Sequence, residues 1–521
     1  MKKSLIERIG EKLPDINIIF LILTGIVLLA SFFLQGEYVF TDLPVAPGED
    51  EVSATVVNMF SVDGLRWMIM HLESNFMGYA PLGLVLVSVV GTSIAEKTGL
   101  FGTLIQKIGS KIKNESLLIP LTIFLGVMSS IASDVGYVVL LPLAGMLFAG
   151  LGKNPLLGIL SAFAGVSAGF AANLFPTPGD ALLGGITLQA TEGITNFEFN
   201  KGLVTMNLYF MIASTFIITL VGWFVTVKFI KPKLEQRKIV VPEEFKTNEL
   251  DTTTAVEKKG LRNAGLAFLA YIVIVLVMYF SGICEFAYNK ETGEILSMAT
   301  YASMGTDEGF KTVNLLLDYL IVFMIFAFLI PGFAYGVTVG KIKSGKDFVN
   351  IIISGLKDNA GVIAVAFFAG NFISIFTHSG IGNLISCNGA NFLYTSGLGE
   401  YPILLLIVFI LLTAFINLFI GSASAKWILL APIFIPMLYQ ANNSMTPDVV
   451  QAAYRVADSS TNIISPLMTY MPIIMILVEK FDKDFNLGTM INIMSRYAII
   501  FLITWTVLFI VWFYMGLPFG I

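Results

Sequence analysis

The stretch from Arg455 to Pro466 places charge, amide and proline inside an otherwise apolar part of the chain. Arg455 and Asp458 lie at i and i+3, so on a helix their side chains are close enough to pair. A guanidinium attracts carboxylates and the amide of Asn462 can hydrogen-bond them, so this stretch could bind an anionic solute together with the break at Pro466. The alternative is a neutralising Arg455–Asp458 ion pair that lets the helix enter a membrane, and the two roles are compatible.

A second polar stretch, from Asn417 to Trp427, precedes the first and contains Ser422 and Ser424. Both serines could cap a helix, and both could also contact a substrate. Trp427 could belong to an interfacial aromatic belt, but its position beside a predicted hairpin tip favours stacking on an aryl ring. Non-helical backbone persists in a membrane only where protein buries it or where it lines a watery cavity. The two stretches therefore predict a solute site near mid-membrane.

A matching break occurs earlier, from Asn173 to Asp180. Asn173 and Asn462 are 289 positions apart, and Pro176 and Pro466 are 290 apart. We expect both amides to bind a substrate carboxylate beside helix N-termini, where the helix dipole favours anions. The alternative is that they satisfy backbone groups freed by the neighbouring prolines.

Asp180 itself has no basic neighbour in the sequence. A buried carboxylate without a partner tends to stay protonated. Asp180 is therefore predicted to bind substrate and to be the proton-coupling residue.

Composition indicates an integral membrane protein, since 56% of the 521 residues are hydrophobic and only 13% are charged, against about 25% charged in soluble domains. Apolar segments of about 20 residues recur along the chain, which predicts an all-α polytopic membrane protein. Basic residues are scattered over short loops, so no nucleic-acid partner is expected. Cys284 and Cys387 belong to no metal motif, and no cofactor motif is present.

Loop charges predict the topology, because Lys and Arg in short loops mark the cytoplasmic side. The basic N-terminus starts inside, and the count reaches about nine transmembrane helices and two re-entrant hairpins. The predicted first half (1–230) contains a hairpin that enters from the inside (116–150, tip at 129–134) and a broken helix (156–190). A cytoplasmic linker (231–262) follows. The predicted second half (263–521) contains a hairpin that enters from the outside (401–439) and a broken helix (448–478). The halves form an inverted repeat, which is typical of secondary transporters with a site at the repeat interface.

Four segments resemble the AbgT family of p-aminobenzoyl-glutamate transporters and sulfonamide exporters: 165–173, 421–427, 431–436 and 454–472. The resemblance implies a homodimeric carrier of the bacterial inner membrane, within the ion-transporter superfamily. It also implies uptake of p-aminobenzoyl-glutamate or export of sulfonamide antimetabolites, with proton coupling. Family functional positions fall on Asp180, Ser424, Trp427, Pro447, Arg455, Asp458 and Pro466. The run Phe-Pro-Thr-Pro-Gly before Asp180 departs from the family pattern.

We therefore expect a secondary active transporter of aryl and carboxylate solutes, with a small-molecule substrate, the lipid bilayer and a second copy as partners. The coupling ion is expected to be H+, with Na+ as the alternative. A sodium-coupled dicarboxylate carrier of the same superfamily is the first alternative function, and a channel is another. An intramembrane enzyme is disfavoured because the sequence has neither a His-Glu-x-x-His helix nor a Gly-x-Ser-x-Gly elbow.

Overall fold

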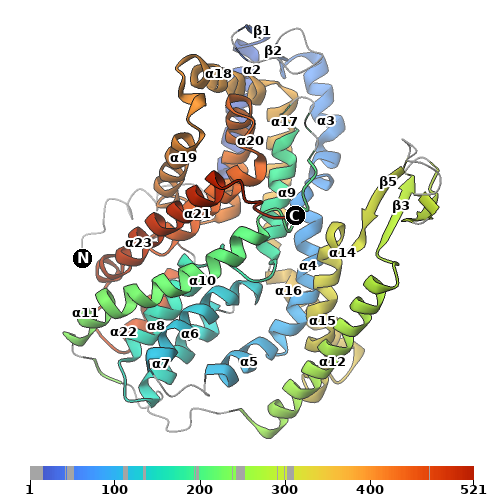
Figure 1. Ribbon diagram of the computed structural model, residues 1–521. Coiled ribbons are helices and arrows are strands. Elements are labelled where there is room, and N and C mark those ends of the chain that lie inside the picture. The colour runs from blue at the N-terminus through green and yellow to red at the C-terminus, as the bar shows by residue number, and fades with distance from the viewer. Residues whose placement is uncertain are drawn as a thin grey trace.

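A computed structural model of the chain (Figure 1) describes residues 16–41, 43, 52–109, 115–132, 136–192, 194, 197, 199–237, 239–241, 253–289, 292–298, 300–301, 310–358, 360–466, 468 and 470–521. The protein is mostly helical, which confirms the predicted fold class. The helices before residue 240 are α2 (Ile16–Phe33), α3 (Val62–Met77), α4 (Ala80–Lys97), α5 (Leu100–Gly109), α6 (Glu115–Met128), α7 (Leu141–Gly150), α8 (Pro155–Phe163), α9 (Pro178–Thr191), α10 (Leu208–Val225) and α11 (Lys231–Glu235).

The remaining helices begin at Ala255, within the last part of the predicted linker. They are α12 (Ala255–Phe280), α14 (Leu315–Asp318), α15 (Leu320–Thr338), α16 (Gly345–Asp358), α17 (Ala360–His378), α18 (Ile381–Thr395), α19 (Pro402–Asn417), α20 (Ala423–Ala441), α21 (Pro447–Asn462), α22 (Met471–Glu479) and α23 (Leu487–Tyr514). Both ends of the predicted linker, 231–235 and 255–262, are thus helical.

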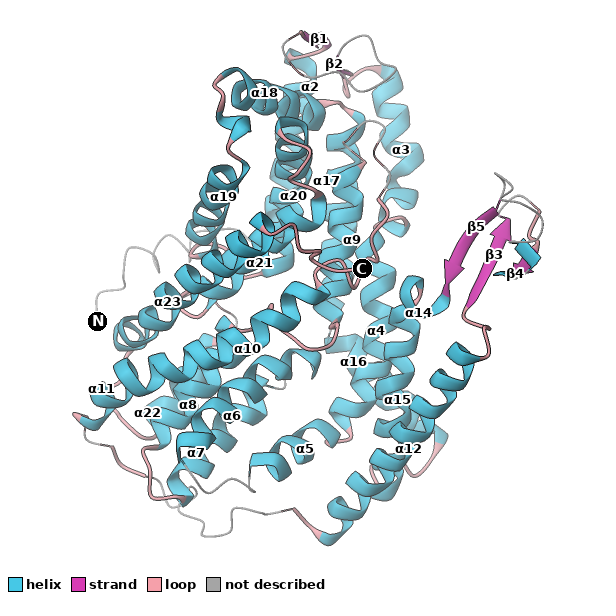
Figure 2. Ribbon diagram, viewed as in Figure 1, coloured by secondary structure: helices cyan, strands magenta, loops and turns pink. Residues whose placement is uncertain are grey.

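Short strands occupy two of the segments between helices, at 36–56 and 285–314, as Figure 2 shows in magenta. Strand β1 (Gly36–Phe40) pairs antiparallel with β2 (Val52–Val56). Strand β3 (Glu285–Asn289) pairs antiparallel with both β4 (Ile295–Ser297) and β5 (Phe310–Asn314). None of these strands is predicted from the sequence, because each is only three to five residues long and lies in a charged loop.

Four helices in the described part of the chain are long and apolar enough to cross a membrane: 208–235, 255–280, 360–378 and 487–514. Six further apolar helices there are shorter: 17–33, 117–131, 136–150, 155–168, 322–338 and 402–417. Interrupted helices are too short to span a bilayer alone, which needs about 20 residues. The predicted count of nine spans and two hairpins, and the inverted repeat, remain predictions.

Local sequence explains where the helices break in the first half. The chain after α6 passes through a 3-10 turn (Ser129–Ala132) and a π-helical turn (Gly136–Leu140) into α7. Of the predicted hairpin tip, residues 133 and 134 lie outside the described residues. After α8 a second π-helical turn (Ala164–Ala168) leads into an irregular stretch, and α9 starts at Pro178 behind the cap Thr177. Proline suits a first helical turn because its missing N–H would be unpaired there anyway.

The second half breaks in two corresponding places. Helix α19 ends at Asn417, and α20 begins after the N-cap Ser422, whose side chain accepts a hydrogen bond from the Ala425 amide. Helix α21 ends at Asn462, and α22 begins only at Met471. These breaks expose backbone groups that regular helices would pair, so they require polar partners or a cavity.

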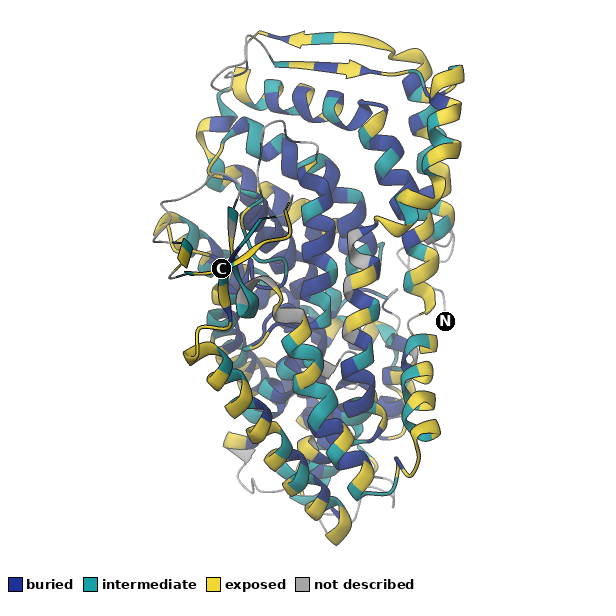
Figure 3. Cartoon of the chain, turned by 90° about the vertical axis from the view of Figure 1, so that its right-hand side faces the viewer, coloured by how far each residue is buried: buried dark blue, intermediate teal, exposed yellow. Residues whose placement is uncertain are grey.

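Burial divides the helices into an inner and an outer set (Figure 3). Helices α8, α9, α20 and α21 are buried over most of their length. By contrast, α12 has only 11% of its apolar window buried within the chain, and α15 lies between it and α4. An apolar surface of this kind suits lipid or a second copy of the chain. The inner helices are the ones that carry the interrupted segments.

Candidate functional site

Helix α21 is buried from Pro447 to Thr461 although it carries charged and polar side chains. It contacts α9, α19, α20 and α23 (Figure 1). A buried charge is tolerated only where it is paired and hydrogen-bonded. The partners of Arg455 and Asp458 therefore show which helices α21 holds together.

Arg455 pairs with Asp180 across the molecule: its Nη1 lies 2.5 Å from Asp180 Oδ1, with side-chain exposures of 5% and 2%. The other oxygen of Asp180 accepts hydrogen bonds from the backbone N–H and the hydroxyl of Thr177, at 2.5 and 2.7 Å. Thr177 and Asp180 thus form a capping box at the start of α9. This geometry corrects two predictions, since Asp180 has a basic partner and Arg455 does not pair with Asp458.

Asp458 instead pairs with Lys426, a residue to which the sequence analysis assigned no role. Lys426 Nζ lies 2.7 Å from Asp458 Oδ1, and both side chains are almost completely buried. The same ammonium donates to Asn417 Oδ1 at 2.5 Å and to the Ile420 carbonyl at 2.8 Å. The Asn417 amide in turn donates to the Asp458 carbonyl at 2.6 Å and to Thr461 Oγ1 at 2.8 Å. We call Lys426, Asp458, Asn417 and Ile420 the lysine cage.

A hydrogen-bond chain links Arg455 to Trp427. Arg455 Nε donates to Gln451 Oε1 at 3.2 Å, and Gln451 Nε2 donates to Thr187 Oγ1 at 2.7 Å. Trp427 Nε1 donates to the same Thr187 oxygen at 2.9 Å, and its ring lies 4.5 Å from that of Tyr454. Because Trp427 is fully buried, it is not an interfacial belt residue. Its predicted stacking on a substrate remains a prediction.

Asn173 is fully buried and connects its helix break to the 3-10 turn that follows α6. Its Nδ2 donates to Ser130 Oγ at 2.7 Å, and its Oδ1 accepts from the Phe175 amide at 3.2 Å. Close by, the Ala171 amide donates to Ser459 Oγ of α21 at 3.0 Å. In this conformation the Asn173 amide supports local backbone, as the structural alternative expected, and its substrate role stays a prediction.

A cavity of about 300 Å³ lies where the interrupted segments meet. Asn462 is the predicted site residue that lines it, and no hydrogen-bond partner of Asn462 Oδ1 occurs among the described residues. Tyr137 and Tyr470 also line the cavity, with their rings stacked at 4.5 Å. The wall further includes Val85, Val89, Ser130, Val166, Phe170, Thr177, Pro178, Gly179, Leu182, Val362, Gly421, Ala423 and Met468.

The other predicted site residues lie around this wall. Ser422 is exposed and its hydroxyl lies 3.3 Å from that of Ser424, while Gly421 and Ala423 beside them line the cavity. Pro466 is half-buried in the break between α21 and α22. Their predicted contact with substrate remains a prediction.

Sequence reasoning missed the two tyrosines and the lysine cage. Tyr137 follows the predicted hairpin tip, and Tyr470 lies in the segment 454–472 but after its charged and amide residues. Of these residues, only Lys426 could have been recognised from the sequence, because it is a single cation in the apolar segment 423–438. An ionisable residue within a membrane segment indicates function by default.

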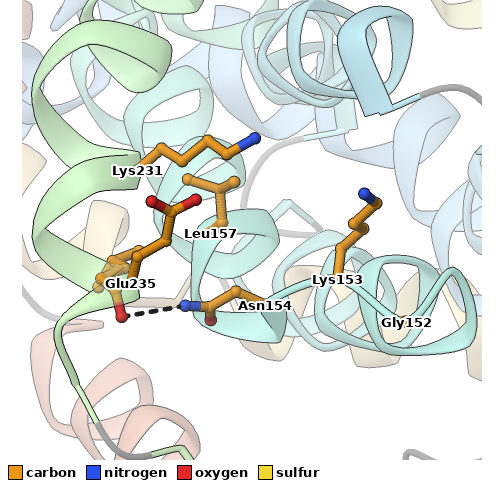
Figure 4. Close-up of a pocket in the computed structure, with 7 residues that line it drawn as sticks. Gly152, Lys153, Asn154, Leu157, Lys231 and Glu235 are labelled. Atoms are coloured by element: carbon orange, nitrogen blue, oxygen red, sulfur yellow. Dashed lines mark hydrogen bonds between the residues drawn. The ribbon is translucent and has the colours of Figure 1, made fainter.

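Another hollow lies elsewhere and shares no residue with the cavity. It has a volume of about 220 Å³ and is lined by Lys153, Asn154, Lys231 and Glu235, among others. Asn154 Nδ2 donates there to the Leu234 carbonyl at 3.4 Å (Figure 4). The charged side chains of this hollow lie next to the start of α8 and on α11, away from the helix breaks. We therefore regard the hollow as a surface feature and not as part of the site.

Comparison with known proteins gives consistent results. The model of the AbgT putative transporter family matches residues 3–521. The p-aminobenzoyl-glutamate transport protein of Escherichia coli (strain K12) is 30% identical over 515 residues, covering 99% of this chain and 95% of the relative. This result confirms the resemblance seen in the sequence.

Two solved structures are similar over nearly the whole chain. The Alcanivorax borkumensis YdaH transporter has a TM-score of 0.85 and 32% identity, covering 98% of this chain and 100% of its own. Neisseria gonorrhoeae MtrF, presented as illuminating a class of antimetabolite efflux pumps, has a TM-score of 0.83 and 37% identity, covering 97% of this chain and 96% of its own.

Proposed function

Because the chain belongs to the AbgT putative transporter family, we propose that it moves p-aminobenzoyl-glutamate or related aryl carboxylates and sulfonamide-like antimetabolites across the bacterial inner membrane. The protein is a multi-pass membrane transporter and not an enzyme. The proposed mechanism is proton-coupled alternating access, in which one site is reached from each side in turn.

The residues of the cavity wall are the main support for the proposed substrate class. Tyr137, Tyr470 and Phe170 offer aromatic surface for an aryl ring. Pro178 and Gly179 present the N-terminus of α9, where the helix dipole favours a carboxylate. Asn462 adds an amide that could hydrogen-bond the amide link or amine of such a solute.

The alternatives are weaker. A sodium-coupled carrier of aliphatic dicarboxylates would make no use of the aromatic side chains Tyr137, Phe170 and Tyr470 in the described wall of the cavity. The similar proteins are described as a p-aminobenzoyl-glutamate transport protein and as antimetabolite efflux pumps. These names support an aryl solute over an aliphatic dicarboxylate.

Transport by purified protein in liposomes tests this function. We expect saturable accumulation of labelled p-aminobenzoyl-glutamate under an imposed pH gradient, and competition by an unlabelled sulfonamide, because both share an aminoaryl ring. A protonophore should abolish accumulation, and protein-free liposomes are the blank. Accumulation under a sodium gradient alone, at equal pH on both sides, would contradict proton coupling.

We propose an orientation with a cytoplasmic N-terminus, and thiol labelling tests it. In a variant with Cys284 and Cys387 replaced by serine, a cysteine at Glu294 should react with an impermeant reagent in intact cells. A cysteine at Lys153 should react only after permeabilisation, because we place Lys-rich loops inside. Labelling of the Lys153 position in intact cells would reverse the orientation. The proposed homodimer can be checked by cross-linking in the same membranes.

A further inference from the structure

The lysine cage carries an inference about which group moves the proton, and it rests on the proposed proton-coupled function. We infer that Lys426 is the proton-carrying residue of the transport cycle and that Asp458 is the counter-ion that holds the proton on it. Lys426 Nζ has three oxygen partners, from Asp458, Asn417 and the Ile420 carbonyl, at 2.5–2.8 Å. Its ammonium is therefore fully satisfied in the conformation described here.

Stability alone does not account for a lysine at this position. Removing two charges from water costs several kcal/mol per ion on the order-of-magnitude scale for buried pairs, and apolar replacements of a whole buried pair are often neutral or stabilising. Lys426 also lies in the first turns of α20, which begins at Ala423. The positive end of the helix dipole disfavours a cation there. A buried charge that costs free energy and lies at the unfavourable end of a helix dipole suggests a functional role.

The second ion pair is poorly suited to release a proton. Arg455 keeps its proton under all conditions met by proteins. Its partner Asp180 is additionally held by two hydrogen bonds from Thr177 on its own helix. Proton uptake by Asp180 would weaken these contacts and leave Arg455 without a charged counter-ion. Lysine, by contrast, changes protonation readily when it is buried.

The cage joins three separate segments of the chain. Lys426 belongs to α20, Asp458 to α21, and Asn417 and Ile420 to the end of α19 and the break that follows it. A shift of α20 relative to α21 that lengthens the 2.7 Å contact between Lys426 and Asp458 would separate the ammonium from the carboxylate. A desolvated ammonium without its counter-ion is unstable and gives up its proton. Access to one side of the membrane is thereby linked to proton release.

The chemical step is a simple proton transfer. One Nζ–H bond of Lys426 breaks, the electron pair stays on nitrogen, and the proton passes to water on the side to which the cage has opened. Water on the other side returns one proton before the cage closes again, so one proton crosses per cycle.

Charged or titratable groups near the cage come from few elements. Helix α18 carries no acidic or basic residue in its sequence, and the carboxylate of α9 is committed to Arg455. Tyr454 donates its hydroxyl proton to the Ala423 carbonyl at the start of α20. The acidic, basic and phenolic groups of the helices packed on α20 are thus Tyr394 on α18, Asp180 on α9, and Asp448, Tyr454, Arg455 and Asp458 on α21, and α18 also carries the thiol of Cys387.

The decisive experiment replaces Lys426 by arginine, which keeps the charge but cannot release a proton. In liposomes, we expect Lys426→Arg to exchange labelled for unlabelled p-aminobenzoyl-glutamate within about three-fold of the wild-type rate, because exchange needs no net proton movement. Accumulation driven by a pH gradient should fall at least ten-fold. Lys153→Arg, at an exposed lysine, is the matched control and should leave both activities unchanged.

A second variant guards against misfolding of the first. Lys426→Gln/Asp458→Asn removes both charges and keeps hydrogen-bonding groups of similar size, so it should also exchange substrate without gradient-driven accumulation. Folding of each variant is checked by size-exclusion chromatography and thermal unfolding. Gradient-driven accumulation by either folded variant overturns the inference, as does loss of exchange in both folded variants, which would make Lys426 a binding or structural residue. Failure of the wild-type protein to respond to a pH gradient would instead overturn the proposed function.

Discussion

Arg455→Ala is expected to destabilise the protein by roughly 3–5 kcal/mol, the usual effect of removing one partner of a buried ion pair. Without the guanidinium that now lies 2.5 Å away, the Asp180 carboxylate, which is only 2% exposed, would be buried with no counter-ion. Gln451 would also lose the hydrogen bond that its Oε1 accepts from Arg455 Nε. Thermal unfolding of the purified protein in detergent measures the change.

Two comparisons separate the ion pair from the mere loss of a side chain. Arg455→Ala/Asp180→Ala removes both charges, so it should be clearly more stable than Arg455→Ala alone. Arg66→Ala breaks a pair with Asp63 at 3.3 Å whose side chains are 71% and 92% exposed, and it should change stability by less than about 1 kcal/mol. Equal losses for Arg455→Ala and Arg66→Ala would contradict the assigned pairing.

Trp427→Ala should also destabilise the protein, by roughly 3–5 kcal/mol, because deleting a buried tryptophan leaves a large cavity. The ring is fully buried against Tyr454 and its Nε1 donates to Thr187. If Trp427 only stacked on a bound substrate, the loss would appear in binding alone, at about 0.5–1.5 kcal/mol. Thermal unfolding without substrate and a binding titration with p-aminobenzoyl-glutamate distinguish these outcomes.

Milder and remote substitutions provide the controls for Trp427. Trp427→Phe keeps an aromatic ring on Tyr454 and loses one hydrogen bond, so it should lose only about 1 kcal/mol. Trp223→Ala removes a tryptophan that is 39% exposed on α10 and should have a much smaller effect. An unchanged unfolding temperature for Trp427→Ala would show that the indole is not part of the core.

The interruptions of the helices were predictable from local sequence. Proline has no N–H to donate and clashes with the preceding helical turn, so Pro176 and Pro466 mark the two breaks in any fold. Ser422 and Thr177 are residue types that cap helices, and both do so. Composition likewise sufficed for the helical membrane class, because few charges and recurrent apolar segments have no soluble equivalent. These features depend on residues within a few positions of one another.

The pairing of the charges was decided only by the tertiary structure. Local spacing made Arg455 and Asp458 plausible partners, yet each pairs with a different neighbouring helix, through Asp180 on α9 and Lys426 on α20. The physical reason is that each buried charge needs a close opposite charge together with hydrogen bonds for its remaining atoms. The Thr177 hydroxyl donates a further hydrogen bond to Asp180, and Asn417 accepts a further hydrogen bond from Lys426. Sequence determined that charges would be buried in interrupted helices, and the packing of those helices determined which charge meets which.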